Sequence, residues 1–249
     1  LLAVRESDGQ NQNTALKLDS NSRISLSNND GGNTGNTIFG KYAWAGHPGD
    51  NDASDFNTIF GEYAMGSGTI DAAEGNTAIG YGALSDVTGA DGNCAVGYLA
   101  GADITIGANN TFLGYNVARL LTQGAENVAI GKNAMAAATT TDGIDRNTFI
   151  GGNSGDGFTA AVANCVGVGH GTLSEALTSG ANGTVAIGYN ALNALTSGGG
   201  NIAIGNEAMD AQTDGTHNIG IGMNALGAAS TGEDHNIAIG TDAMGNANH

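Results

Sequence analysis

Three carboxylates, those of Asp50, Asp52 and Asp55, stand close together in the sequence and are its candidates for metal binding. Ca²⁺ is bound by carboxylate and carbonyl oxygens, so a loop of this kind could hold the ion. The residue spacing of an EF-hand and its closing Glu are both absent, however. An acidic loop that simply faces solvent is the competing interpretation.

Two histidines, His217 and His235, occupy the same place in successive sequence repeats, directly before an Asn. They could stack at one edge of the molecule and bind a transition metal, although two exposed turn residues would give the same pattern. No combination of Ser, His and Asp suggests a nucleophile. Glycine strings such as 198–200 lack the Lys and Ser or Thr of a phosphate-binding loop. The sequence therefore predicts no catalytic site, no cofactor and no enzymatic activity.

The two cysteines, Cys94 and Cys165, lie in different repeats and at different places within the repeat. In a stack of repeats they would be too far apart for a disulfide, whose Cα atoms lie within about 7 Å of each other. We expect both to be small buried residues.

These isolated residues are set in a phrase that recurs twelve times and is clearest at 76–84 and 201–209. It consists of Asn, two small or β-branched residues, a large apolar residue and Gly, with Ala-Leu or Ala-Met three residues later. A unit of 17 to 21 residues, repeated this often, predicts a stack of coils rather than a globule. The repeat glycines are Gly40, Gly61, Gly80, Gly97, Gly114, Gly131, Gly151, Gly169, Gly188, Gly205, Gly222 and Gly240.

The residue before each repeat Gly is apolar in every unit, which predicts a continuous apolar core along the stack. The run that ends at this residue is rich in β-forming residues, and the Ala-Leu pair is expected to form a second, shorter strand. We therefore predict an all-β fold, a parallel β-roll or β-solenoid of about twelve coils, with each Gly at a turn of positive φ or a close backbone approach. The predicted core residues are Phe39, Phe60, Ile79, Val96, Leu113, Ile130, Ile150, Val168, Ile187, Ile204, Ile221 and Ile239.

Asn stands four residues before the repeat Gly in ten units, with Cys165 and Thr184 as the exceptions. Two interpretations are open for these asparagines. Their side-chain amides could bond to one another from coil to coil, or each could cap its own turn.

Residues 1–35 lack the repeat, and two segments within them, 15–19 and 23–27, alternate apolar and polar residues. This alternation predicts two strands joined by a turn, which would serve as a lead-in or cap. Residues 36–249 form the repeat domain. The chain begins without Met and ends within a unit, so we expect it to be a piece of a longer protein that continues the repeat.

With 43 Gly, one Pro and 12% charged residues, the chain must draw its stability from repeated backbone pairing rather than from a bulky core. One short coil encloses little volume, so we expect several chains to pack side by side with closed symmetry, which also covers sheet edges. The net charge of −17 opposes binding to nucleic acid or to anionic lipid. No apolar run is long enough for membrane insertion, and no signal peptide is recognisable.

The phrase Asn-x-Ala-Ile-Gly-x-x-Ala resembles the head repeats of YadA-type trimeric autotransporter adhesins, which form a left-handed parallel β-roll in a homotrimer. The resemblance covers residues 36–249, although those head repeats are shorter. Similar repeats are found in tail fibres of bacteriophages, particularly marine ones, and segment 21–30 resembles such a fibre more than an adhesin. The resemblance implies a homotrimer and carries over no catalytic residue.

The resemblance further implies a structural section of a phage tail fibre, on the virion, that takes part in host-surface recognition and attachment. Its partner would be a host cell-surface glycan or protein, contacted by the stretched segments 46–56, 136–146 and 157–164 or by a tip outside this piece. The head of an adhesin on the bacterial surface is one alternative. A ligand-free spacer or self-assembling filament is another. A glycan-cleaving enzyme is a further alternative, but it would need a carboxylate pair in a groove, and nothing in the sequence marks one.

A further alternative is ice binding through a flat array of threonines. Five Thr share one place in the repeat, from Thr37 to Thr148. The same place is taken by Val185 and then by Ile in later units, which is typical of a partly buried position.

Overall fold

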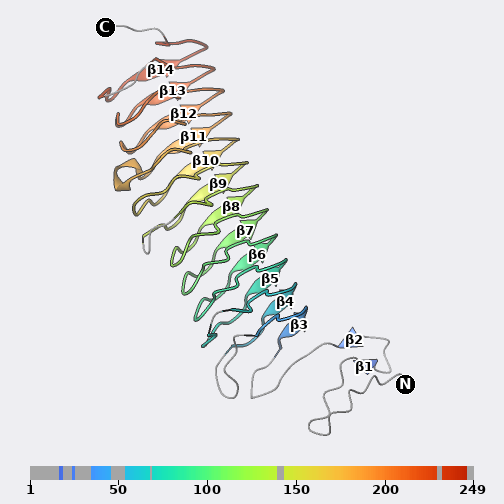
Figure 1. Ribbon diagram of the computed structural model, residues 1–249. Helices are drawn as coiled ribbons and strands as arrows, with labels where there is room; N and C mark the ends of the chain where they lie inside the picture. Colours follow the sequence, from blue (N-terminus) through green and yellow to red (C-terminus); the bar gives the residue numbers. More distant parts are fainter. Residues whose placement is uncertain are drawn as a thin grey trace.

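The computed structural model describes residues 17–18, 24–25, 35–45, 54–67, 69–138, 143–228 and 232–245, most of which belong to one rod-shaped stack of coils (Figure 1). Twelve strands of three residues form a single parallel sheet along the rod. These strands are β3 (Thr37–Phe39), β4 (Thr58–Phe60), β5 (Thr77–Ile79), β6 (Cys94–Val96), β7 (Thr111–Leu113), β8 (Val128–Ile130), β9 (Thr148–Ile150), β10 (Val166–Val168), β11 (Val185–Ile187), β12 (Ile202–Ile204), β13 (Ile219–Ile221) and β14 (Ile237–Ile239).

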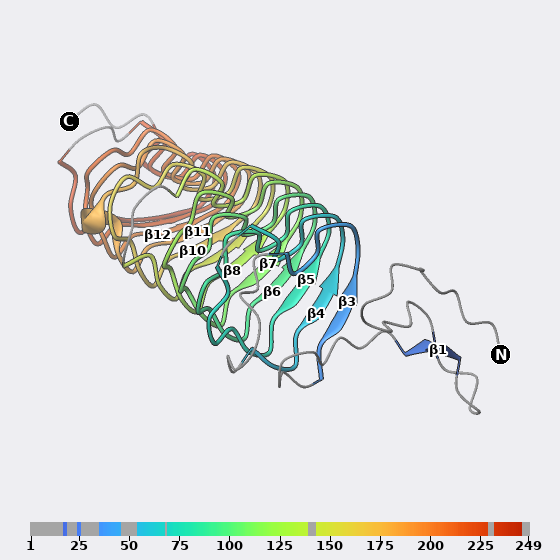
Figure 2. The same ribbon diagram turned by 60° about the horizontal axis from the view of Figure 1, so that its bottom comes forward.

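Each strand pairs with its neighbours in chain order, from β3 to β14, and the repeats are in register. Thr58, for example, lies between Thr37 and Thr77. Register is strictly specified here because a slip of one residue would turn every side chain to the opposite face. Figure 2, which turns the rod toward its axis, shows one coil behind another. The predicted parallel β-solenoid is confirmed.

Two short strands lie outside this sheet. Strand β1 (Lys17–Leu18) pairs antiparallel with β2 (Ile24–Ser25), as the alternating pattern of the lead-in segment predicts.

Within the described residues, the Ala-Leu pair forms a turn instead of the second strand predicted in each coil. Leu84 has a φ of 50° and Gly82 a φ of 60°, so the backbone is left-handed where a strand would have to be extended. The turn still bonds to the next coil, since the Leu84 N–H donates to the Ala100 carbonyl at 3.0 Å. Equivalent bonds recur along the rod, so this side of the coil is held together without a second sheet.

The core predicted from the residue before each repeat Gly is wrong within the single chain, because that residue faces outward. Strand side chains alternate between faces, and the middle residue of each strand points inward. Ile59, Ala78 and Phe112 are such middle residues and are fully buried. The outward residues are exposed or half-buried: Phe39, Phe60, Ile79, Val96, Leu113, Ile130, Ile150, Val168, Ile187, Ile204, Ile221 and Ile239.

The core instead joins the middle strand residues to the Ala-Leu turn opposite, where Ala83 and Leu84 are fully buried. Large and small residues compensate for one another across this core. A Cβ added at Gly101 would lie 2.7 Å from the Phe112 ring, so glycine replaces the usual large residue of the turn there. Phe149 is accommodated in the same way by Gly155 and Gly167. Large and small residues are therefore exchanged between positions so that the rings fit inside the coils.

Both predicted reasons for the repeat glycines, a positive φ and a close backbone approach, are found in the structure. Their φ angles lie between 127° and 147°, a region that other residues rarely adopt. Where a further coil follows, an added Cβ would collide with the carbonyl oxygen of the next repeat Gly; at Gly114 this atom is Gly131 O, 2.6 Å away. Backbone therefore touches backbone at this corner of every coil.

We predict that Gly114→Ala destabilises the fold strongly, by about 3 kcal/mol or more, because strain and steric collision add. The matched control is Gly75→Ala. Gly75 also has positive φ, but nothing lies within 4 Å of its added Cβ. This variant should cost only about 1 kcal/mol. Denaturant unfolding of both variants measures the difference, and equal losses would contradict the stacking constraint.

Buried asparagines form a ladder along the rod, as one of the two interpretations of this column predicts. The Asn93 Oδ1 accepts the Asn110 backbone N–H at 2.9 Å and the Asn110 Nδ2 at 3.0 Å. The Asn110 Nδ2 also donates to the Gly124 carbonyl at 2.7 Å. Because both ends of each buried amide are bonded, the ladder satisfies polar groups that would otherwise be costly to bury.

The ladder is interrupted where Cys165 and Thr184 replace Asn. Cys165 still donates its backbone N–H to the Asn147 Oδ1 at 3.0 Å, but its thiol offers no equivalent acceptor to the next coil. The Thr184 hydroxyl is buried and has no hydrogen-bond partner. Coils eight and nine are therefore joined less firmly than their neighbours.

We predict that Asn110→Ala lowers the free energy of unfolding by about 2–5 kcal/mol, because the Asn127 N–H and the Gly124 carbonyl lose buried partners. Thr184→Asn should act in the opposite direction, by about 1 kcal/mol, since an amide there can accept from Asn201 and donate to the Gly198 carbonyl. Chemical denaturation measures both. A neutral Asn110→Ala would show that the ladder does not stabilise the stack.

Candidate functional site

The outer face of the parallel sheet is a regular surface that extends along the rod. It consists of the first and third residues of β3–β14. Its third residues, the column wrongly predicted to be the core, are large and apolar in every coil, and Phe39 and Phe60 stack at 4.9 Å between ring centroids. Phe60 is 53% exposed and Ile239 68% exposed. A contiguous apolar strip of this length is typical of an interaction surface.

The first residues of the strands change character along the same face. They are mostly Thr from β3 to β9 and become Val and Ile from β10 to β14. Thr37, Thr58 and Thr111 are exposed. Cys94 belongs to this column and is half-buried. The face therefore runs from a mixed Thr and aromatic end to a wholly aliphatic end.

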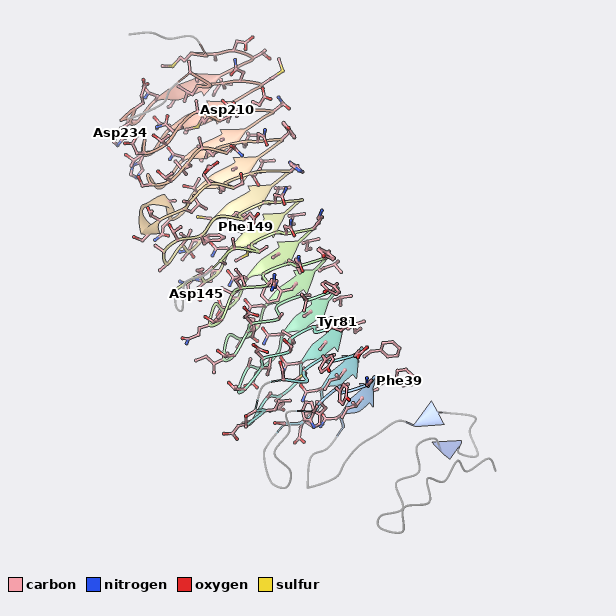
Figure 3. The ribbon with its side chains drawn as sticks, viewed as in Figure 1. Phe39, Tyr81, Asp145, Phe149, Asp210 and Asp234 are labelled. Carbon is pink, nitrogen blue, oxygen red and sulfur yellow. The ribbon has the colours of Figure 1, made fainter. Side chains whose placement is uncertain are left out.

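A second surface is the edge of the rod where coil length varies. In coils longer than 17 residues, the additional residues fall after the Ala-Leu turn and before the next repeat Asn; the 3-10 helix η2 (Ser179–Ala181) is one such addition. We call this the variable edge. Figure 3 shows Asp145 and Asp234 on this edge, on the side of the rod away from Phe39 and Tyr81.

Segment 157–164 and the described residues of 136–146 lie on the variable edge, and 157–164 is not a simple loop. Phe158 and Val162 are fully buried, and the Phe158 ring packs edge-on against Phe149 at 5.4 Å between ring centroids. The third predicted loop, 46–56, lies outside the described residues up to residue 53.

The candidate calcium ligands are only partly placed. Asp50 and Asp52 lie outside the described residues. Asp55 is half-buried, and its backbone carbonyl accepts the Gly75 N–H at 2.9 Å. Across the described residues, no three His, Cys, Asp or Glu side chains gather as a metal site requires.

His217 and His235 stack on successive coils, as their positions predict. Their ring centroids are 5.2 Å apart and the rings are 14° from parallel. Both side chains are exposed at a turn with positive φ. Parallel rings direct their nitrogens side by side rather than toward one point, so this arrangement does not form a chelating pair.

Cys165 is fully buried, and burial raises the pKa of its thiol. Cys94, by contrast, lies on the outer face. Both cysteines are free. Because Cys94 is only half-buried, the expectation of two buried cysteines holds for Cys165 alone.

Several carboxylates have perturbed acidity. Burial raises the pKa of Asp103, Asp156 and Asp210, and the neighbouring Glu207 adds to the effect at Asp210. The pKa of Asp234 is lowered, because the Thr216 backbone N–H and hydroxyl both donate to it. These groups are spread along the rod and do not form an acid–base pair.

One exposed row was not anticipated from the sequence. Tyrosines follow the repeat Gly at its first or second position in the first five coils, and their rings form a continuous series on one edge of the rod. The tyrosine row is Tyr42, Tyr63, Tyr81, Tyr98 and Tyr115. The sequence signal was available, since three of these residues occupy one place in successive repeats.

The comparisons with known proteins found no family model, no curated protein and no solved structure that matches the chain. Among the described residues, no helix is long and apolar enough to cross a membrane.

We predict that the fold is less stable at about pH 7.5 than at about pH 4, because a carboxyl whose folded pKa is raised above its ordinary value of 3.8 loses stabilisation as pH rises through the folded pKa. The lowered pKa of Asp234 acts only below its ordinary value of 3.8. Thermal unfolding at constant ionic strength measures the difference. Asp210→Asn should raise the midpoint at the higher pH only, and a higher midpoint at pH 7.5 in the unaltered chain would contradict the prediction.

Proposed function

We propose that this chain is a structural section of a trimeric phage tail fibre that presents a host-recognition surface. The observation that carries the proposal is the outer face of the sheet, which is apolar in every coil and exposed in the single chain. Covering this face with further copies removes the largest apolar area from water. The resemblance of the repeat to trimeric head repeats supports the number of copies.

The gradient along the outer face favours parallel, in-register packing. When copies run in the same direction, the Thr-rich end meets the Thr-rich end and the Ile-rich end meets the Ile-rich end. An antiparallel pair would place the hydroxyl of Thr37 against Ile237. Closed symmetry around one axis lets three such faces cover one another without leaving a free copy of the face.

The variable edge supports the proposal that different surfaces of the fibre serve assembly and recognition. Assembly through the outer face needs every coil to be alike, whereas recognition benefits from local differences in chain length and side chains. The variable edge lies away from the outer face, so it stays accessible in the trimer. Three copies on one rigid rod would raise the avidity of weak contacts by increasing their effective concentration.

We predict that light scattering of the purified chain gives the mass of a trimer and that Ile204→Glu dissociates it. The reason is that a carboxylate in a dry apolar contact is expensive, while the same side chain on a single chain remains partly solvated. Ser179→Glu adds the same charge at the exposed variable edge and should leave the trimer intact. A monomeric unaltered chain would overturn the proposal.

Cys94 reports the direction of packing. In a parallel, in-register trimer the three Cys94 thiols lie at one level, whereas a fully overlapped antiparallel pair places Cys94 opposite Val185. A short bis-maleimide should therefore link two chains, and Cys94→Thr, the residue type of neighbouring strands, should abolish the product. A trimer that gives no Cys94 product would overturn the parallel arrangement.

A further inference from the structure

The tyrosine row is a continuous exposed surface over the first five coils. Tyr81, Tyr98 and Tyr115 stack with ring centroids 5.3 and 5.1 Å apart and ring planes within 12° of parallel. At the other end Tyr42 and Tyr63 stack at 5.0 Å. The ring planes turn by 69° between Tyr63 and Tyr81, where the row passes from one place in the repeat to the next.

The rings present their edges and hydroxyls to solvent, because their faces largely cover one another. Each remains between 36% and 50% exposed. Figure 3 shows Tyr81 projecting from the rod near the end of its strand, on the same side as Phe39. The result is a row of exposed phenol rings, one in each of the first five coils.

Stacking of the coils does not need these tyrosines. In later coils the sheet continues unchanged although the equivalent place varies, being taken in turn by Lys132, Gly152, His170, Tyr189, Asn206, Met223 and Thr241. The outer face, by contrast, is apolar through all twelve strands. An unbroken stack of tyrosines is confined to the first five coils, with Tyr189 standing apart beside His170 in a later one, so the stack serves something local rather than the assembly of the rod.

The charge of the row limits what it can contact. The chain carries a net charge of −17, so an anionic polymer is repelled. Charged residues of both signs accompany the row: Lys41, whose Nζ is 4.7 Å from the Tyr42 ring centroid, Glu62 and Lys132. A neutral partner that offers many hydroxyls and some apolar surface matches phenol edges and hydroxyls best.

We propose that the tyrosine row binds a linear, neutral glycan that lies along the rod. An extended sugar chain repeats hydroxyls and C–H groups at nearly regular intervals, and the row repeats a hydroxyl and a ring edge about every 5 Å. Each sugar residue then meets one tyrosine, so contacts accumulate with chain length. This inference names a site separate from the variable edge.

The test is binding of the full chain to neutral oligosaccharides of graded length, measured by microarray and then by calorimetry. At least one neutral series should bind, with affinity rising until the oligosaccharide spans the row and then levelling. Tyr81→Phe, Tyr98→Phe and Tyr115→Phe combined remove only hydroxyls, and should weaken binding at least about tenfold. Tyr189→Phe, a tyrosine that stacks on His170 outside the row, is the matched control and should bind normally.

Light scattering of the same variants separates this proposal from the trimer proposal, since the triple variant should keep the mass of the unaltered chain. The site would be overturned if no neutral oligosaccharide bound, if the triple variant bound as well as the control, or if the row captured a protein instead. Binding that is stronger for acidic than for neutral oligosaccharides would overturn the assigned ligand class.

Discussion

The close approach of one backbone to the next at the repeat glycines is the constraint on which the structure depends. The carbonyl of each repeat Gly occupies the space that a Cβ would need on the Gly of the preceding coil. This contact limits the distance between successive coils. The parallel hydrogen bonds, the Asn ladder and the stacked aromatic rings all form across that same distance. The short strands could not hold the rod alone, because three residues make too few bonds without repeated partners on both sides.

The sequence was sufficient to predict the class of fold and the phase of the repeat, since period, Gly and Asn positions together allow few alternatives. It was not sufficient to decide which strand face is buried. Ile79 and Ala78 are both apolar, and hydrophobicity alone favours the larger one as core. The alternation of side chains along the strand decides the choice, because Asn76 and Ala78 face inward and Ile79 therefore faces outward. The prediction of a second strand at the Ala-Leu pair was wrong for a related reason. A pattern of apolar residues does not indicate that Leu84 has a left-handed φ.

The candidate sites were less predictable than the fold. Residue types alone favour Asp55 and the histidine pair as candidate ligands. The stacked rings of the histidine pair, however, offer no shared position for a ligand. The surfaces that the structure does offer are produced by stacking, which turns one ordinary residue per repeat into a long column. A single exposed Ile or Tyr means little in a sequence, and its meaning appears only when neighbouring coils place the same type beside it.

The exchange of volume between Phe112 and Gly101 has a consequence for how such a rod can change over time. Because the ring enters space left by a glycine in another coil, neither unit is self-sufficient. Unequal recombination that deleted or duplicated one unit would bring a phenyl ring against a leucine, or leave a void beside a glycine. The coils containing Phe112 and Phe149 should therefore be inherited as blocks with their partners, whereas gain and loss of units is freer among the Ala-centred coils.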